Sequence, residues 1–137
     1  MTMRLAILCP GQGSQGPSMF DLAAGDAAAL DRVQAWLREA DGPVSSTPLA
    51  ALLAHPSAMF DNRSAQPLVV GATLMAWTML AGQLPRPALV AGYSVGEVSA
   101  YAVAGALPRS QTVTTDSSTT ASSSPSTPMR QVPTACP

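Results

Sequence analysis

The sequence predicts an α/β fold in which short parallel strands are covered by helices. Two short apolar runs, at residues 3–9 and 88–92, each lead into a glycine-containing turn, and helical patterns fill the sequence between them. Strands that alternate with helices in this way form parallel sheets. The chain has 137 residues, of which 47% are hydrophobic and only 11% charged. It therefore has room for one domain, and so few charges are typical of part of a larger α/β protein.

The first strand and the first helix have clear boundaries. Residues 3–9 form an apolar run that Pro10-Gly11 closes, which is typical of a buried strand entering a tight turn. A helix is expected over residues 26–40, because apolar side chains recur on one face and Asp26 can cap its start. Gly42-Pro43 then ends this helix.

Two further helices, the second strand and a last helix follow. One helix is expected over residues 47–55, with Thr47 as its cap and a proline at its first position. The next is expected over residues 64–82, with Ser64 as its cap. The second strand leads into a final helix that begins near Val95.

The composition changes abruptly near residue 108. Seven serines, seven threonines and four prolines occupy the last 29 residues, which contain neither leucine nor any aromatic residue. Such a segment cannot bury enough apolar area to offset its loss of conformational entropy. We therefore expect a folded domain over residues 1–108 and a disordered tail over residues 109–137.

Charge and cysteine content exclude several classes of function. A net charge of −1, with no block of like charge, gives no basis for binding nucleic acid or an anionic membrane. Cys9 and Cys136 lie in unlike contexts at opposite ends of the chain, so neither a disulfide nor a metal-ligand spacing is indicated. The apolar part of residues 68–81 is too short and too interrupted for a membrane span. We expect a cytoplasmic protein without a metal.

A candidate nucleophile lies between the second strand and the final helix. Gly92-Tyr93-Ser94-Val95-Gly96 matches the pattern G-x-S-x-G. In a nucleophile elbow, this pattern holds the serine in a strained conformation at the end of a sheet, and the helix N-terminus directs free N–H groups at an oxyanion. The same residues also fit a serine that caps an ordinary strand–helix junction, and the motif alone does not separate the two interpretations.

A second candidate site follows the first strand, at the loop Pro10-Gly11-Gln12-Gly13-Ser14-Gln15. Its spacing is neither that of a dinucleotide-binding loop nor that of a P-loop, so no nucleotide cofactor is indicated. Glycine lets a backbone N–H come close to a ligand, so this loop can supply a second oxyanion donor. A plain glycine-rich turn is the alternative.

Three motifs in consistent order resemble a known family. The segments CPGQGSQ, SAQPL and AGYSVGEVSAYAVAGAL are similar to malonyl-CoA:acyl-carrier-protein transacylases, over about residues 3–108. Family members usually carry histidine before the serine. Tyr93 at that place looks more like the transacylase (epsilon) subunit of malonate decarboxylase. The resemblance implies the N-terminal portion of an α/β-hydrolase-like acyltransferase domain, without its inserted ferredoxin-like subdomain.

The resemblance also implies roles for individual residues. Ser94 takes the malonyl group from malonyl-CoA as a serine ester, which a carrier thiol then collects. The backbone N–H groups of Gln12 and Val95 form the oxyanion hole. Further positions support the loops or contact the substrate, namely Gln66, Gly11, Gly13 and Tyr93. The implied partners are malonyl-CoA and an acyl carrier protein, or the malonate decarboxylase carrier subunit with its CoA-like prosthetic group.

The chain departs from the family downstream of the elbow. There the family has a histidine as general base and an arginine that holds the malonyl carboxylate, and neither matching region is present. The only histidine, His55, precedes the elbow at a helix end, while Arg109 and Arg130 have no family motif around them. We expect a truncated transacylase, its reading frame lost near Pro108, with little or no turnover. A serine esterase and a non-catalytic fragment that binds a carrier are the alternatives.

Overall fold

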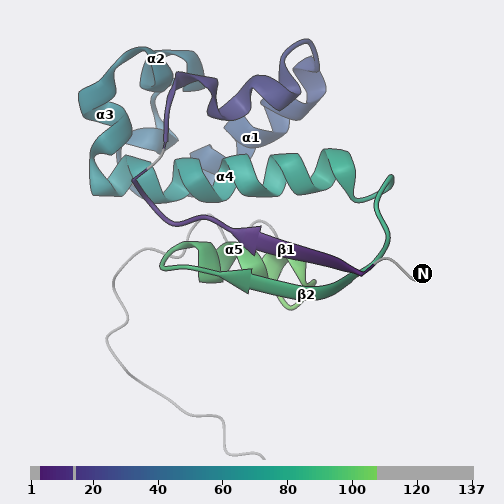
Figure 1. Cartoon of the computed structure of the whole chain (residues 1–137). Helices are drawn as coiled ribbons and strands as arrows, with labels where there is room; N and C mark the ends of the chain where they lie inside the picture. Colours follow the sequence, from purple (N-terminus) through teal and green to yellow (C-terminus); the bar gives the residue numbers. More distant parts are fainter. Residues whose placement is uncertain (1–3, 14, 108–137) are drawn as a thin grey trace, which may run out of the picture.

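The polypeptide begins with a strand, passes through a series of helices and returns to a second strand and a last helix (Figure 1). A computed structural model describes residues 4–13 and 15–107. The expected tail over residues 109–137 lies outside these residues. The elements are β1 (Leu5–Cys9), η1 (Pro17–Ala23), α1 (Ala27–Glu39), η2 (Pro43–Ser45), α2 (Leu49–Ala54), α3 (Pro56–Phe60), α4 (Asn62–Leu80), β2 (Pro87–Gly92) and α5 (Gly96–Val103).

The two strands pair in parallel, so the predicted α/β class is confirmed. The pairing runs from Leu5 opposite Pro87 to Cys9 opposite Gly92, with one irregularity after Leu5. Parallel strands end at the same edge of a sheet, and this carboxyl edge is where α/β proteins bind ligands. The loop after β1 and the turn after β2 therefore emerge side by side.

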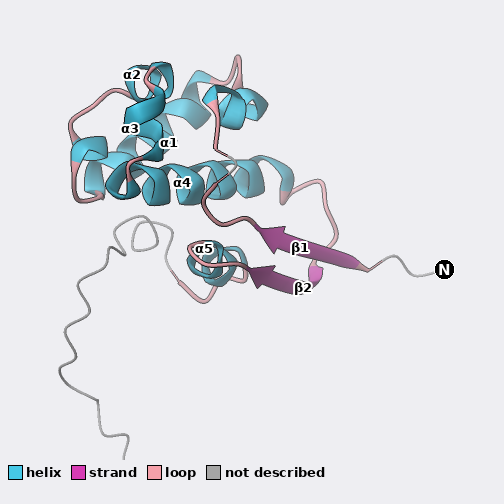
Figure 2. Cartoon of the chain, turned by 60° about the vertical axis from the view of Figure 1, so that its left-hand side comes forward, coloured by secondary structure: helices cyan, strands magenta, loops and turns pink. Residues whose placement is uncertain are grey.

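Helix α4 is the central element of the fold. Helices α1, α2 and α3 lie on one side of it, and β1, β2 and α5 lie on the other (Figure 1 and Figure 2). Five consecutive residues of α4, from Pro67 to Gly71, are buried, which places covered side chains on every face of the helix. Val33 and Leu37 of α1 are fully buried, and both approach Gly71 of α4 closely. The core therefore forms mainly between α1 and α4.

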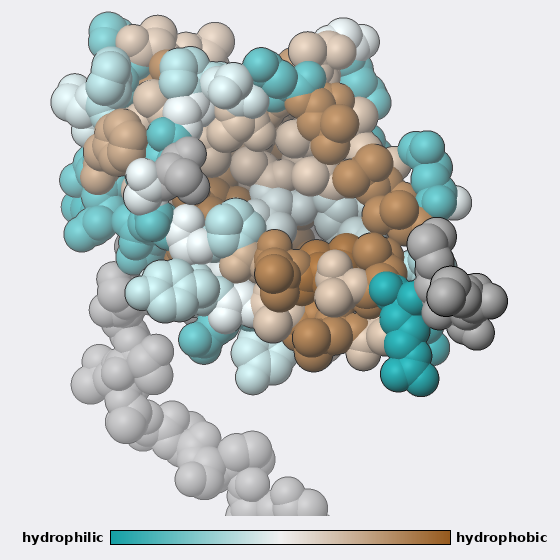
Figure 3. Space-filling view, viewed as in Figure 1, coloured by the Kyte–Doolittle hydropathy of each residue, from teal (hydrophilic) through white to brown (hydrophobic). Residues whose placement is uncertain are grey.

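One face of the sheet is covered and the other is open. Cys9 is buried, and Ile7 and Val90 pack against the core. On the opposite face of the same strands, Leu8 is 76% exposed and Leu89 is 57% exposed. Figure 3 shows a broad apolar patch at the level of the strands. Parallel sheets are usually covered on both faces, so this open face is unusual.

Asp26 acts as the cap that the sequence predicted for α1. Its carboxylate accepts a hydrogen bond from the N–H of Ala29 at 2.9 Å. This side chain satisfies one of the four N–H groups that a helix start leaves without a partner.

The predicted caps of the next two helices are wrong, by one and by three residues. Helix α4 begins at Asn62, because Asp61 rather than Ser64 caps it and accepts from the N–H of Arg63 at 3.2 Å. Ser64 lies buried inside the helix. Helix α2 has Pro48 at its cap position without a side-chain hydrogen bond, and Thr47 has no capping role. Gln34 of α1 replaces the cap, because its side-chain amide oxygen Oε1 accepts from the first N–H of α2, that of Leu49, at 2.7 Å.

Candidate active site at the ends of the strands

Ser94 lies in a strained turn between β2 and α5. Its φ is +56°, and it is the one residue other than glycine with positive φ in the part of the chain that the structure describes. Left-handed backbone costs an ordinary residue about 1–2 kcal/mol. Hydrogen bonds close the turn on both sides, from the N–H of Gly96 to the carbonyl of Tyr93 and from the N–H of Glu97 to that of Ser94, each at 2.9 Å. The turn therefore presents an exposed Ser94 side chain at the end of the sheet.

The two glycines of the motif are required because there is no space for a side chain. A Cβ on Gly92 would overlap the carbonyl group of Gly96, at the start of α5. A Cβ on Gly96 would overlap the carbonyl of Cys9 and come within 2.6 Å of the carbonyl oxygen of Pro10. Helix α5 therefore starts in direct backbone contact with the end of β1, as an elbow requires.

The glycine-rich loop after β1 lies against the elbow. The N–H of Tyr93 donates to the carbonyl of Cys9 at 3.2 Å, which ties the elbow to the end of β1. A Cβ on Gly11 would lie 2.8 Å from the carbonyl oxygen of Tyr93 and 3.3 Å from Cβ of Ser94. The structure thus brings together the two candidate sites, which are about 80 residues apart in the sequence.

The side chain of Gln12 is held by the first turns of α4. Its amide nitrogen donates to Asn62 at 3.0 Å, and its amide oxygen accepts from Gln66 at 3.4 Å. Within residues 4–13 and 15–107, the backbone N–H groups of Gln12 and Val95 donate to no other group. Both amides are thus free to serve as donors to a ligand, which is what an oxyanion hole needs.

Two residues at the site were not given roles from the sequence. Asn62 holds Gln12, and Gln15 is 9% exposed with both ends of its side-chain amide hydrogen-bonded. The second glutamine of the GQGSQ segment was the available signal for Gln15. No local signal marks Asn62, because its partner lies 50 residues away in the sequence.

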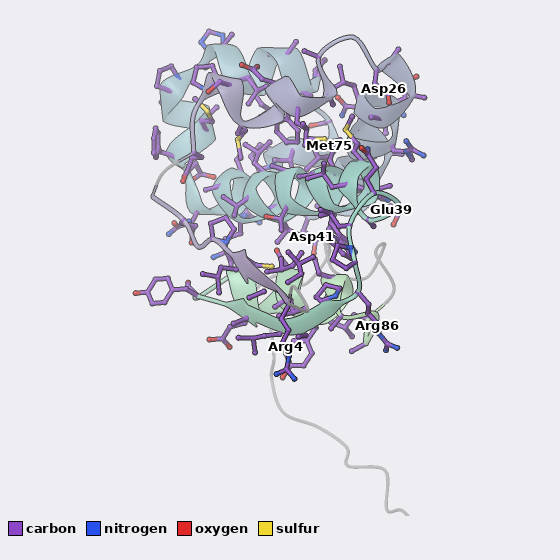
Figure 4. All side chains as sticks on the ribbon, turned by 45° about the vertical axis from the view of Figure 1, so that its right-hand side comes forward. Arg4, Asp26, Glu39, Asp41, Met75 and Arg86 are labelled. Carbon is purple, nitrogen blue, oxygen red and sulfur yellow. The ribbon has the colours of Figure 1, made fainter. Side chains whose placement is uncertain are left out.

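Neither His55 nor the arginines that precede the two strands contact Ser94. His55 is exposed at the junction of α2 and α3, and its side chain makes no hydrogen bond there to Ser94. Arg4 and Arg86 precede β1 and β2, so they lie at the opposite edge of the sheet (Figure 4). A strand of five residues spans roughly 17 Å, which is too far for either guanidinium to contact the elbow.

Other features of the site region are apolar. A cavity of about 370 Å³ lies between β1 and α4 and reaches Gly11 and Gln15 at one end. Burial raises the pKa of the Cys9 thiol, which disfavours the reactive thiolate.

In the described part of the chain, no three acidic, histidine or cysteine side chains gather to hold a metal ion. None of the helices there is long and apolar enough to cross a membrane.

Comparison with known proteins supports the resemblance of the motifs. No family model matches the chain. The chain is 39% identical over 106 residues to a curated malonyl CoA-acyl carrier protein transacylase of Mycobacterium tuberculosis, and the match covers 75% of this chain and 34% of the relative. The chain thus spans about a third of the length of the curated relatives it matches.

Solved structures agree with the sequence comparison. The structure of MCAT from Mycobacterium tuberculosis matches with a TM-score of 0.67 and 40% identity, over 79% of this chain and 36% of that one. An acyl carrier protein S-malonyltransferase from Vibrio cholerae matches with the same TM-score and 32% identity, over 79% and 35%. The resemblance to malonyl-CoA:acyl-carrier-protein transacylases is confirmed. The finer likeness to malonate decarboxylase, which rests on Tyr93, stays a prediction.

Proposed function

We propose that this chain carries the nucleophile part of a malonyl-CoA:acyl-carrier-protein transacylase, with Ser94 as the residue that is acylated. The observation that supports this most directly is the positive φ of Ser94 between Gly92 and Gly96, which both lack space for a side chain. A serine that merely caps a helix needs neither the left-handed conformation nor the two glycines. Such strain is typical of functional sites, where the surrounding structure maintains it.

The proposed reaction has two steps at the same serine. The Ser94 hydroxyl attacks the thioester carbonyl of malonyl-CoA, the C–S bond breaks, and CoA leaves as a thiol with the proton from serine. A carrier thiol then attacks the malonyl-serine ester, and the serine hydroxyl is restored. The N–H groups of Gln12 and Val95, which donate to no other group among the described residues, would stabilise the oxyanion in both steps. The acceptor is an acyl carrier protein, with the malonate decarboxylase carrier as the second choice.

Turnover is expected to be slow. A serine hydroxyl is a weak nucleophile at neutral pH unless a base removes its proton. Among the described residues no base contacts Ser94. We therefore expect acylation to be measurable mainly as slow formation of the ester.

Hydrolysis is the second candidate function, because the side chain of Ser94 is exposed and water has free access to it. A serine esterase would form the same ester and discharge it to water. The two functions differ only in what removes the acyl group.

Intact mass spectrometry distinguishes these functions. The 137-residue protein is incubated with malonyl-CoA, next to Ser94→Ala and to Ser57→Ala as an exposed serine outside the site. We expect a malonyl adduct in the wild type and in Ser57→Ala that is absent in Ser94→Ala and is removed by a holo acyl carrier protein. Loss of the adduct in buffer alone indicates hydrolysis. Absence of any adduct contradicts the proposal and indicates a non-catalytic fragment.

A further inference from the structure

The side chain of Gln15 connects two segments that are far apart in the sequence. Its amide oxygen accepts a hydrogen bond from the N–H of Gly13 at 2.7 Å. Its amide nitrogen donates to the carbonyl of Met59 at 3.4 Å. Gln15 is only 9% exposed, and a buried polar side chain is stable only when both of its ends have partners.

The Met59 contact gives the loop a fixed anchor. Met59 lies in the last turn of α3, where a helix leaves its carbonyl groups without N–H partners. Its side chain is 2% exposed and belongs to the hydrophobic core. The carbonyl of Met59 is therefore held in place by the core, and Gln15 transfers this rigidity to the loop after β1.

The Gly13 contact fixes the backbone next to the proposed oxyanion donor. The N–H of Gly13 belongs to the peptide unit that follows Gln12, so its direction sets ψ of Gln12. Gly13 has φ of +123° and no atom within 4 Å of the position of a Cβ, so side-chain packing does not hold it. The hydrogen bond to Gln15 is the contact in the described residues that restrains this peptide. The Gln12 side chain is held separately, by Asn62 and Gln66.

We infer that Gln15 is a positioning residue, which restrains the loop backbone on the C-terminal side of Gln12 by binding the Gly13 amide and anchoring it to α3, and so limits movement of the Gln12 N–H. This inference rests on the proposed function, because the oxyanion role of Gln12 is part of it. Glutamine suits the task because its planar amide offers an acceptor to Gly13 and a donor to Met59 at the same time. Methionine matches its length and offers neither.

Amide hydrogen exchange, followed residue by residue by NMR, tests the contact without any need for activity. In the wild-type chain, Gly13 is expected to exchange about fivefold to tenfold more slowly than Gln12 in the same loop, the factor that one hydrogen bond typically gives. Gln15→Met is expected to remove this difference, with the amides of α4 unchanged. Gln15→Glu keeps the acceptor for Gly13 but loses the donor to Met59, so it is expected to retain only part of this difference. Gln83→Met, a change at an exposed glutamine outside the loop, serves as the control.

The rate at which malonyl-CoA acylates Ser94 tests the consequence for the site. Gln15→Met is expected to acylate about 10-fold to 100-fold more slowly than the Gln83→Met control, because an oxyanion donor that is out of place loses much of its effect. Equal rates overturn the inference. A wild-type Gly13 amide that exchanges as fast as that of Gln12 also overturns it. So does a Gln15→Met variant in which the amides of α4 exchange faster as well as that of Gly13. If Gln15→Met does not fold, the exchange rates of the Gly13 amide in the wild type and in Gln15→Glu decide whether the inference holds. If the wild type forms no adduct, the proposed function fails, while the exchange data still decide whether Gln15 holds the loop.

Discussion

Replacement of Gly96 by alanine tests whether the start of α5 touches β1 as closely as the structure indicates. The new Cβ would lie 2.6 Å from the carbonyl oxygen of Pro10 and closer still to the carbonyl of Cys9. Both are backbone atoms, so no side chain can rotate away, and α5 must move by several tenths of an ångström or more. Overpacking of this kind costs about 1–3 kcal/mol. A helix gains less than 1 kcal/mol from the higher propensity of alanine. Because both clashes involve backbone atoms, we expect a cost near the top of that range and a net loss of about 2 kcal/mol.

Thermal unfolding followed by circular dichroism measures this loss. For a domain of about 100 residues, 2 kcal/mol lowers Tm by about 8–16 °C. Gly82→Ala is the matched control, because no atom lies within 4 Å of its Cβ position, and its Tm is expected to stay the same or rise slightly. A Gly96→Ala protein with the Tm of the wild type would refute the backbone contact, and with it the geometry of the elbow.

Four more predictions follow from the same structure. Ser94→Gly is expected to raise the free energy of unfolding by about 1 kcal/mol, because glycine tolerates positive φ, while the malonyl adduct disappears in intact mass spectra. Asp26→Ala is expected to lower it by about 1 kcal/mol in urea unfolding, through loss of the cap of α1. Leu74→Ala is expected to cost about 2–5 kcal/mol in the same assay, whereas Leu89→Ala, at an exposed position, is expected to cost much less. Because the pKa of Cys9 is raised in the folded state, the unfolded state loses the thiol proton first as the pH rises. The free energy of unfolding is therefore expected to fall above about pH 8.5, and to fall less in Cys9→Ala. Urea unfolding at several pH values measures this, and an equal decrease with pH in both proteins would contradict it.

Features that depend on a few neighbouring residues could be predicted from the sequence. Both strands, the helix after Asp26 and the turn around Ser94 occur where local patterns place them. A Gly-x-Ser-x-Gly segment between a strand and a helix is such a pattern, although only the crowding at Gly92 is local; Gly96 is crowded by Cys9 and Pro10, far away in the sequence. The parallel pairing of β1 and β2 also follows from local information, since a strand–helix–strand order favours it.

The two wrong helix starts had different causes. At Thr47, the usual capping pattern failed because Gln34 of another helix satisfies the first N–H of α2. At Ser64, the pattern failed because Asp61, three residues earlier, is the stronger acceptor and the helix starts there. A threonine or serine before a helical pattern indicates only that a cap is available. Which group supplies it depends on nearby competitors such as Asp61 and on tertiary contacts such as that of Gln34.

The polar contacts that hold the loop after β1 were beyond sequence reasoning for the same reason. Gln12 meets Asn62 and Gln66 across 50 and 54 residues, and Gln15 meets Met59 across 44. The resemblance to the transacylases indicated Gln66 but gave it no partner. The structure supplies the partner, which is the side chain of the residue whose backbone N–H is the proposed oxyanion donor.

The shape of the nucleophile and its reactivity have separate physical origins in this chain. The shape comes from backbone contacts among β1, β2 and α5, all within the described residues, so the elbow can form without any group that removes a proton. Reactivity needs such a group, and two of the basic side chains on the described surface, Arg4 and Arg86, lie at the far edge of the sheet. An oxyanion hole stabilises charge that develops in the transition state, but it does not generate the alkoxide. Since no base contacts Ser94 among the described residues, hydroxide from the solvent has to remove its proton, and the acylation rate is expected to rise as the pH is raised.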